Sequence, residues 1–370
     1  MSRELLGLVV FTVFCIIISP FYKEVTRVHT PVKPVYTLAK RTTVQTDNPK
    51  TIVFLSDKFL PTTFAGSELS GYETLKYMRE RGHTIIIFVK QWKVSDYDGF
   101  SIYKYDQKDP ICVTTIVESD IVFFQMGDET EHFEIIKHRN KPVYMFIHNA
   151  NHYYWILQQK LKFPVHVVYN SHMTQDEIPT LHDNMRMIPY VDTSRFKPLR
   201  SISVSNNVVC LINCSKNKGG DIFKQLATKL TNVQFLGVKG AYGIQSIDQT
   251  TPDNLTYIEN QKDITVVFRR IGILLMPSKN ETWGRTAVEA MASGVPVIHS
   301  QAVGLVECVG GAGILCSLDD IDAWADAIRR IVGDPAYREH LRQNGFKRVK
   351  EIEIEQERGR QELAIKVERR

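Results

Sequence analysis

The sequence predicts an α/β protein made of two domains, each built around a doubly wound, largely parallel sheet. The first observation is a strand, a helix and a second strand over residues 51–89, which form one βαβ unit and therefore require parallel strands. The second is that strands and helices alternate again after residue 208. The third is the length of 370 residues, which is enough for two separate cores.

The first domain is expected to begin with a buried strand at 51–55. A glycine turn at 64–69 leads into a helix that runs to Arg81, and the second strand covers 84–89. Three further apolar runs have the length of strands: 121–125, 143–147 and 165–169. Their spacing is typical of a sheet whose strands are connected by helices.

Residues 191–198 form the bridge to the second domain. That domain is expected to alternate strands (208–213, 233–237, 255–259, 271–276, 295–299) with helices (220–230, 287–293). Two amphipathic helices follow at 321–332 and 335–350. Residues 351–370 are densely charged with alternating sign, so we expect a solvated C-terminal helix there.

Composition and charge restrict the classes of function. The net charge is only +5, and no stripe of basic residues with interleaved aromatics occurs, so nucleic acid is not an expected partner. The six cysteines include no CxxC pair, which argues against a zinc site and a redox dithiol. His148 and His152 have helical zinc-ligand spacing but lack the glutamate of a metalloprotease. These patterns therefore do not predict a zinc site.

The N-terminus is expected to hold a transmembrane anchor at residues 1–22. Residues 5–19 are almost wholly apolar, and Phe21 and Tyr22 follow like an interfacial aromatic pair, which gives a span near the lower limit for crossing a bilayer. A cleaved signal peptide is the alternative, although no small-residue cleavage site follows. Residues 23–47 combine prolines, threonines and basic residues without periodicity and predict a linker.

The orientation of the anchor follows from the residues on either side of it. More basic residues follow the span than precede it: Lys23, Arg27 and Lys33 against Arg3. The positive-inside rule then places the bulk of the chain in the cytoplasm. Glycosylation acceptor patterns begin at Asn213, Asn254 and Asn280, and two of them lie in loops of the expected ligand site, where a glycan would block binding. A lumenal position, in the Golgi or the endoplasmic reticulum, is the alternative.

The most specific motif surrounds Glu281 and Glu289, two carboxylates eight positions apart. Glu281 is expected in a polar loop after an apolar strand, and Glu289 one to two turns into the helix that follows. A strand, a loop and a helix start form an anion site, because free N–H groups and the helix dipole point at it. Carboxylates on its rim accept hydrogen bonds from hydroxyls. A nucleotide diphosphate sugar, with phosphates between two groups of sugar hydroxyls, fits this layout.

In its context the motif resembles the Glu-x7-Glu signature of retaining GT-B glycosyltransferases, most closely the family-four group. The context is Pro277-Ser278 before it, then residues 289–298 and Gly304-Leu305-Val306-Glu307 after it. The resemblance implies a GT-B fold, in which two Rossmann-like domains face each other across a cleft: an acceptor-side domain (48–195) and a nucleotide-sugar donor domain (196–350). It also implies a UDP- or GDP-linked hexose as donor, a glycan or lipid-linked acceptor, and neither cofactor nor metal.

The resemblance further implies roles for single residues. Glu281 would bind hydroxyls of the transferred sugar, and His148 would meet that sugar near its anomeric carbon with its backbone or its ring. Lys218 would stabilise the leaving phosphates, and Glu289 would bind the ribose diol. Further phosphate contacts would come from Gly66, Gly284, Arg285 and Thr286. Asn213 stands where the family usually has a second cation, an arginine five residues before the lysine, so one positive charge is missing.

Other interpretations remain for both the residues and the protein. His148 could be a structural histidine, Lys218 a surface lysine and Gly66 a plain helix-start turn. The missing cation at Asn213 also fits a catalytically inactive sugar-nucleotide-binding or scaffold protein of the same fold. An epimerase or an inverting transferase of this fold is less favoured, because neither carries the Glu-x7-Glu pattern.

Overall fold

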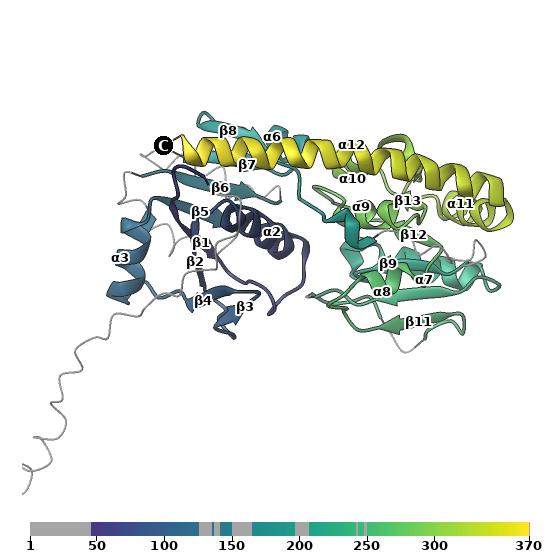
Figure 1. The fold of residues 1–370 in the computed structure, drawn as a ribbon. Coiled ribbons are helices and arrows are strands. Elements are labelled where there is room, and N and C mark those ends of the chain that lie inside the picture. The colour runs from purple at the N-terminus through teal and green to yellow at the C-terminus, as the bar shows by residue number, and fades with distance from the viewer. Residues whose placement is uncertain are drawn as a thin grey trace, which may run out of the picture. The chain divides into compact units, whose positions relative to one another are not determined.

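The computed structural model describes residues 46–125, 135–136, 141–149, 165–196, 207–241, 243–247 and 250–369 (Figure 1). The predicted anchor and nearly all of the predicted linker lie outside these residues. Within the described ranges, no helix combines the length and the apolar character needed to span a bilayer. The anchor therefore stays a prediction.

The first domain contains an eight-stranded sheet in the order β3-β4-β2-β1-β5-β6-β7-β8. Its strands are β1 (Thr51–Ser56), β2 (Thr84–Val89), β3 (Asp96–Tyr97), β4 (Phe100–Lys104), β5 (Ile121–Gln125), β6 (Val143–Ile147), β7 (Val165–Tyr169) and β8 (Asp183–Arg186). All neighbours pair in parallel except β3 and β4. The strand order reverses between β1 and β5, and ligands of doubly wound sheets bind at the carboxyl ends of the strands near such a reversal. The predicted parallel sheet is confirmed.

Helices α2 (Gly66–Glu80), α3 (Pro110–Glu118) and α6 (His172–Glu177) connect these strands. Local signals set where two of them begin. Asp109 caps α3, because its side chain accepts a hydrogen bond from the Ile111 N–H and Pro110 occupies the first turn. Ser171 caps α6 through a reciprocal pair of hydrogen bonds with Thr174. The short helix η1 (Thr193–Phe196) lies in the predicted bridge.

The second domain contains a six-stranded, wholly parallel sheet in the order β11-β10-β9-β12-β13-β14. The strands are β9 (Val209–Ile212), β10 (Phe235–Val238), β11 (Leu255–Ile258), β12 (Ile273–Met276), β13 (Val297–His299) and β14 (Ile314–Leu315). The helical segments are η2 (Lys216–Lys218), α7 (Gly220–Lys229), α8 (Thr265–Phe268), α9 (Arg285–Ala292), α10 (Val303–Val309), η3 (Gly310–Ala312) and α11 (Ile321–Gly333). This order reverses between β9 and β12, the strand that leads to the Glu281 motif.

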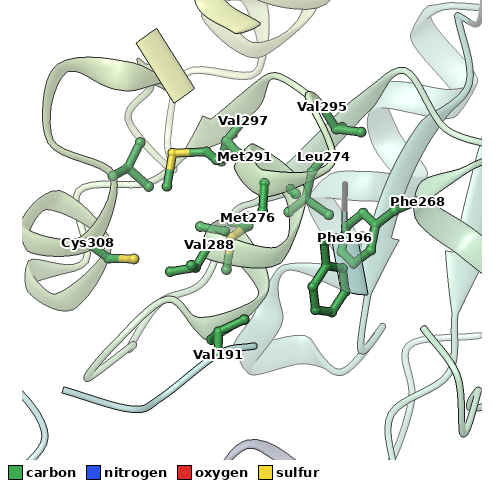
Figure 2. Packing of buried hydrophobic residues seen from close by; sticks show 14 of the residues in the cluster. Val191, Phe196, Phe268, Leu274, Met276, Val288, Met291, Val295, Val297 and Cys308 are labelled. Atoms are coloured by element: carbon green, nitrogen blue, oxygen red, sulfur yellow. The ribbon is translucent and has the colours of Figure 1, made fainter. Parts of the chain in front are cut away.

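The central strands of the second sheet are buried on both faces, which explains why β9, β10 and β12 are apolar. Along β12, Ile273 and Leu275 pack with α7 and α11 on one face, while Leu274 and Met276 pack with α9 and α10 on the other. Figure 2 shows the second of these clusters, with Val288 and Met291 of α9 among the labelled side chains. This packing fixes α9, and with it the position of Glu289.

The C-terminal segment differs from the expectation. Instead of an amphipathic helix at 335–350 followed by a solvated one at 351–370, a single helix, α12, runs over Pro335–Glu368. Its last turns are not solvated on all sides, because Leu363, Ala364 and Val367 are buried in the core of the first domain. The helical spacing of these apolar residues within a charged segment is typical of a helix with one buried face, and it is the signal that could have predicted this burial.

Candidate functional site

A cleft with a volume of about 960 Å³ is lined by residues of both domains. On the first domain its walls are the start of α2 and the residues after β6 and β7, and on the second domain they are the ends of β9 and β12 with their following loops. Seven of the eight predicted site residues line it: Gly66, His148, Lys218, Glu281, Arg285, Thr286 and Glu289. The volume is that of a typical site for a small molecule or cofactor.

Gly284 is the predicted site residue that does not line the cleft. It is the N-cap residue of α9, and a Cβ atom on it would come within 2.9 Å of Leu305 Cδ2 and 3.3 Å of Cys308 Sγ. Glycine is therefore required here by the close packing of α10. Any contact of Gly284 with a ligand is limited to its backbone.

The loop that carries Glu281 is held from two sides by glycines. Gly219 has a left-handed φ of 84°, and a Cβ atom on it would lie 2.4 Å from the Pro277 carbonyl oxygen. A Cβ atom on Gly304 would lie 2.4 Å from the Glu281 carbonyl oxygen, and the Gly304 N–H donates to that oxygen at 3.1 Å. The turn before α7 and the start of α10 thus fix the loop in front of α9.

Glu281 and Lys218 form an ion pair inside the cleft. The Lys218 Nζ lies 2.5 Å from Glu281 Oε2, and both side chains are largely buried, with exposed fractions of 27% and 15%. Ser278 Oγ donates to the same carboxylate oxygen at 3.4 Å. The predicted phosphate-binding cation and the predicted sugar-binding carboxylate are therefore direct neighbours. A diphosphate in the cleft would compete with Glu281 for Lys218.

Glu289 and Arg285 form a second pair one turn into α9. Arg285 Nε donates to Glu289 Oε1 at 3.1 Å, and Arg285 Nη1 donates to the Tyr190 carbonyl oxygen at 2.5 Å. Burial raises the pKa of Glu289 above its usual range, which the charge of Arg285 opposes. Two of the five guanidinium donors are engaged by Glu289 and Tyr190, and the start of α9 adds backbone N–H groups from which an anion could accept hydrogen bonds.

Asn213 has the uncommon left-handed φ of 69° directly after β9. Its Oδ1 accepts a hydrogen bond from the Ser215 N–H at 3.2 Å. Asparagine is one of the few residues that adopt this conformation without a large penalty. Lys216, the lysine nearest to Asn213 in the sequence and a possible replacement for the missing cation, is exposed and lies outside the cleft. Four cationic side chains line the described part of the cleft: Arg195, Lys218, Lys262 and Arg285.

His148 follows β6 and is held at both its carbonyl and its ring. Its carbonyl oxygen accepts from Thr282 Oγ1 at 2.7 Å and from Asn170 Nδ2 at 3.2 Å. Its Nε2 lies 2.9 Å from Gln125 Oε1. Burial lowers the pKa of the His148 ring to about 4, so the ring is neutral at physiological pH. Thr282 belongs to the Glu281 loop, which therefore contacts the first domain at His148.

Gly66 is the first residue of α2, and a Cβ atom on it would meet no atom within 4 Å. Packing against the described residues therefore does not require glycine at this position. A glycine here leaves the backbone open to close approach by a ligand in the cleft.

Three polar residues of this region were missed by the sequence analysis: Gln125, Asn170 and Thr282. Gln125 and Asn170 come at or just after the end of a buried strand, where side chains of a doubly wound sheet face the ligand site. The same position at a strand end identifies His148 as a site residue, and it would have identified Gln125 and Asn170 as well. Within the described ranges, no cluster of three or more histidine, cysteine, aspartate or glutamate side chains is arranged to hold a metal ion.

Comparison with protein families gives one match. Residues 208–348 match the family described as glycosyl transferases group 1. This range begins just before β9 and ends within α12, so it contains Lys218, Glu281 and Glu289. It covers less than half of the chain.

Curated relatives match over parts of their length. The capsular polysaccharide biosynthesis glycosyltransferase CapM of Staphylococcus aureus is 29% identical over 135 residues, which are 34% of this chain and 36% of CapM. The D-inositol 3-phosphate glycosyltransferase of Nocardioides sp. is 33% identical over 108 residues, 29% of this chain and 22% of the relative. The chain thus spans about a third or less of the length of these relatives.

Solved structures match over most of the chain. Anabaena Alr3699/HepE in complex with UDP-glucose has a TM-score of 0.72 at 16% identity, covering 85% of this chain and 99% of its own. Sucrose-phosphate synthase from Thermosynechococcus elongatus has a TM-score of 0.65 at 17% identity, with coverages of 82% and 94%. These similarities and the two parallel sheets confirm the predicted two-domain α/β fold of the GT-B type. At such identities they carry no further conclusion.

Proposed function

We propose that this protein is a retaining, metal-independent glycosyltransferase of the family-four type. It moves a hexose from a UDP- or GDP-linked donor to a glycan or lipid-linked acceptor. The observation that carries the proposal is the arrangement at the start of α9. There Glu281, Glu289 and Lys218 line a cleft of nucleotide-sugar size, and His148 faces it from the other domain.

The relatives support both the activity and the donor. CapM and the Nocardioides protein are named as glycosyltransferases, the first of capsular polysaccharide biosynthesis and the second for D-inositol 3-phosphate. HepE has been solved with UDP-glucose and with UDP and glucose. A nucleotide diphosphate sugar as donor and a polyhydroxylated acceptor are consistent with these names.

In the proposed mechanism, the acceptor hydroxyl attacks the anomeric carbon on the face from which the diphosphate leaves. The bond from the anomeric carbon to the phosphate oxygen breaks as the new glycosidic bond forms, and the hydroxyl proton passes to the leaving diphosphate. Lys218 and the N–H groups of α9 stabilise the charge on that diphosphate. Glu281 positions the sugar and Glu289 the ribose, so the protein contributes orientation and electrostatics.

A panel of nucleotide sugars tests the proposal. UDP-glucose, UDP-galactose, UDP-N-acetylglucosamine and GDP-mannose are added to the purified protein, and the shift in melting temperature is measured for each. Binding of one donor at one hundred times its Kd should stabilise the fold by about 2.7 kcal/mol. The anomeric configuration of the product, read by NMR, should match that of the donor. The absence of a shift with every donor, or a product of inverted configuration, would sink the proposal.

A second candidate function is sugar-nucleotide binding without transfer, which the neutral Asn213 favours. Slow hydrolysis of the bound donor without acceptor distinguishes the two. An active transferase should release free hexose faster than the Glu281→Ala variant does. An inactive binding protein should release it at the same rate as that variant.

We also propose that residues 1–22 anchor the protein in a membrane and that the two domains lie on its cytoplasmic side. The support is the apolar run at 5–19 and the excess of basic residues after it.

A further inference from the structure

We propose that Gln125 is a positioning residue that fixes His148 in its Nε2-protonated form, so that Nδ1 offers a hydrogen-bond acceptor to a hydroxyl of the sugar in the cleft. This inference rests on the proposed function, because it assigns an atom of His148 to the bound sugar. The resemblance leaves open whether the backbone or the ring of His148 contacts the sugar, whereas this proposal assigns the contact to Nδ1 of the ring.

The carbonyl of His148 is already occupied. It accepts one hydrogen bond from Thr282 Oγ1 at 2.7 Å and another from Asn170 Nδ2 at 3.2 Å. A carbonyl oxygen has two lone pairs, and these two donors use both. The carbonyl of His148 is thus engaged in joining the Glu281 loop to the first domain, and the hydrogen-bond acceptor of this residue left for a sugar hydroxyl is in the ring.

The orientation of the Gln125 amide follows from its second partner. Gln125 Nε2 donates to the Ser67 carbonyl oxygen at 3.0 Å, and a carbonyl oxygen only accepts. The amide oxygen of Gln125 must therefore be the atom that faces His148 Nε2 at 2.9 Å. An amide oxygen also only accepts, so the Nε2 atom carries the proton and Nδ1 carries the lone pair.

The Gln125 side chain has little freedom to turn away. It is 1% exposed, and a Cβ atom on Gly71 of α2 would come within 2.9 Å of its Oε1. Ser67, which accepts its other hydrogen bond, follows Gly66 at the start of α2. Gln125 therefore connects the glycine turn of the first domain to the histidine, and the ring lies in the wall of the same cleft.

The charge state of the ring agrees with this assignment. Burial lowers the pKa of His148 to about 4, so the Nδ1 lone pair is present at physiological pH. The side chains that β5, β7 and α2 contribute beside it are uncharged. Among the residues that the structure describes, the charged groups that line the cleft around it are the Lys218–Glu281 pair, the Arg285–Glu289 pair, Glu177, Arg195 and Lys262.

The protonation of the ring is tested on the wild-type protein without a ligand. Long-range ¹H–¹⁵N NMR at pH 7 distinguishes protonated from unprotonated ring nitrogens, and His148→Asn assigns the signal. His299 is an internal control of opposite form, because its Nδ1 lies 2.9 Å from the Ser300 carbonyl oxygen and must carry the proton. We expect His148 to be Nε2-protonated and neutral. An Nδ1-protonated or charged His148 ring would overturn the proposal, whether or not the protein is a transferase.

The role of Gln125 is tested with Gln125→Glu, by measuring the affinities of UDP-glucose and UDP between pH 5.5 and 8. A carboxylate beside Nε2 favours the charged ring, which places a proton on Nδ1 and removes the acceptor. UDP-glucose affinity of the variant should then fall at the acid end by about five- to tenfold, the size of one lost hydrogen bond. UDP affinity should follow the wild-type pH profile, since UDP lacks the hexose that would meet His148.

Gln234→Glu, which changes an exposed glutamine outside the cleft, is the matched control and should behave as wild type. Identical pH profiles of UDP-glucose affinity in Gln125→Glu and wild type would contradict the proposal, and so would an equal loss of UDP affinity. If wild type binds neither UDP nor UDP-glucose, the donor is not UDP-linked and the comparison is repeated with GDP-mannose and GDP, while the NMR measurement still decides the form of the ring. That measurement also stands if Gln125→Glu fails to fold.

Discussion

Glu281 lines the cleft and is held there by its surroundings. It sits in a loop that two glycines clamp, and its charge is balanced by Lys218 at 2.5 Å. If a nucleotide sugar binds at this position, the lysine would pair with a phosphate and the carboxylate would accept hydrogen bonds from sugar hydroxyls. The ion pair holds both side chains in place before the ligand binds.

Replacing Glu281 with alanine should abolish transfer while leaving the fold intact. The expected loss of kcat is about a hundredfold or more, because sugar positioning acts on the transition state. Turnover with the best donor from the panel and a circular dichroism melt are the measurements. The control is Glu259→Ala, which breaks an exposed pair of the same kind, with Lys239 Nζ 2.5 Å from Glu259 Oε1. Wild-type turnover of Glu281→Ala would refute the assignment.

Glu289→Gln should weaken nucleotide binding and flatten the pH dependence of stability. Burial raises the pKa of Glu289, so the folded protein holds its proton more tightly than the unfolded chain does. The wild-type free energy of unfolding should therefore fall as the pH rises from 4.5 towards the raised pKa, and the variant should lack this contribution. Nucleotide affinity should drop by about 1–3 kcal/mol, the size of a lost hydrogen bond to a charged group.

Urea unfolding at several pH values and calorimetric titration with the nucleotide measure the two effects of Glu289→Gln. Unchanged nucleotide affinity would show that the carboxylate does not contact the ligand.

At the scale of elements, α12 contacts both domains. Near its start Gly345 packs on Met291 of α9, and near its end Glu368 accepts two hydrogen bonds from Arg81, at 2.6 and 2.8 Å. His83 Nε2 lies 3.3 Å from the same carboxylate. The buried Leu363 and Val367 add apolar contacts, so the end of the helix is part of the first domain's core.

Glu368→Gln should destabilise the protein by about 1–3 kcal/mol at pH 7, because a charged acceptor of the Arg81 guanidinium is lost. Burial of Glu368 opposes ionisation, but the hydrogen bonds from Arg81 and His83 outweigh it and lower its pKa. This stabilisation is fully present above pH 4.5 and is lost as the pH falls through the lowered pKa. The difference from wild type should therefore shrink in acid.

Urea unfolding at pH 7 and at acid pH checks the effect of Glu368→Gln, with the exposed Glu362→Gln on the same helix as control. Equal stability of the two variants at pH 7 would mean that the Arg81 pair does not hold the helix.

At the scale of the whole molecule, the packing described above for the two sheets and α12 is formed by residues within 46–369. A variant that begins at Thr46 should be soluble and should transfer to a soluble acceptor at the rate of the full chain. Solubility and turnover are the measurements. Insolubility or inactivity of this variant would show that the apolar run at 5–19 belongs to the fold.

The orientation across the membrane has its own test, and the structure changes which residue to use. Asn254 is unsuited to carry a glycan, because its side chain is buried and its Nδ2 donates to three carbonyl oxygens, those of Ala227, Leu230 and Val233. Asn280 is exposed in the loop before Glu281. Expressed in a eukaryotic cell, the protein should show no mobility shift on glycosidase treatment. A shift that disappears in Asn280→Gln would place the domain in the lumen and refute a cytoplasmic orientation.

Most of the seven site residues that line the cleft were assigned from the resemblance to GT-B glycosyltransferases. The sequence by itself determined the parallel sheets, the strands 84–89, 121–125, 143–147 and 165–169 at their observed bounds, and the position of His148 at a strand end that faces the cleft. It did so because a strand buried on both faces is a short apolar run, and because the ends of such strands meet at one edge of the sheet. Both signals are local in the chain.

Only the tertiary structure decided which partners the site residues have. The Lys218–Glu281 pair joins residues 63 positions apart, and the bond from Thr282 to the His148 carbonyl spans 134 positions. Gln125, 23 positions from His148, sets the form of that ring, and α12 is buried at its end by a core that begins at Ile52. These contacts depend on how two sheets and a long helix pack, and no periodicity within a single segment encodes that packing.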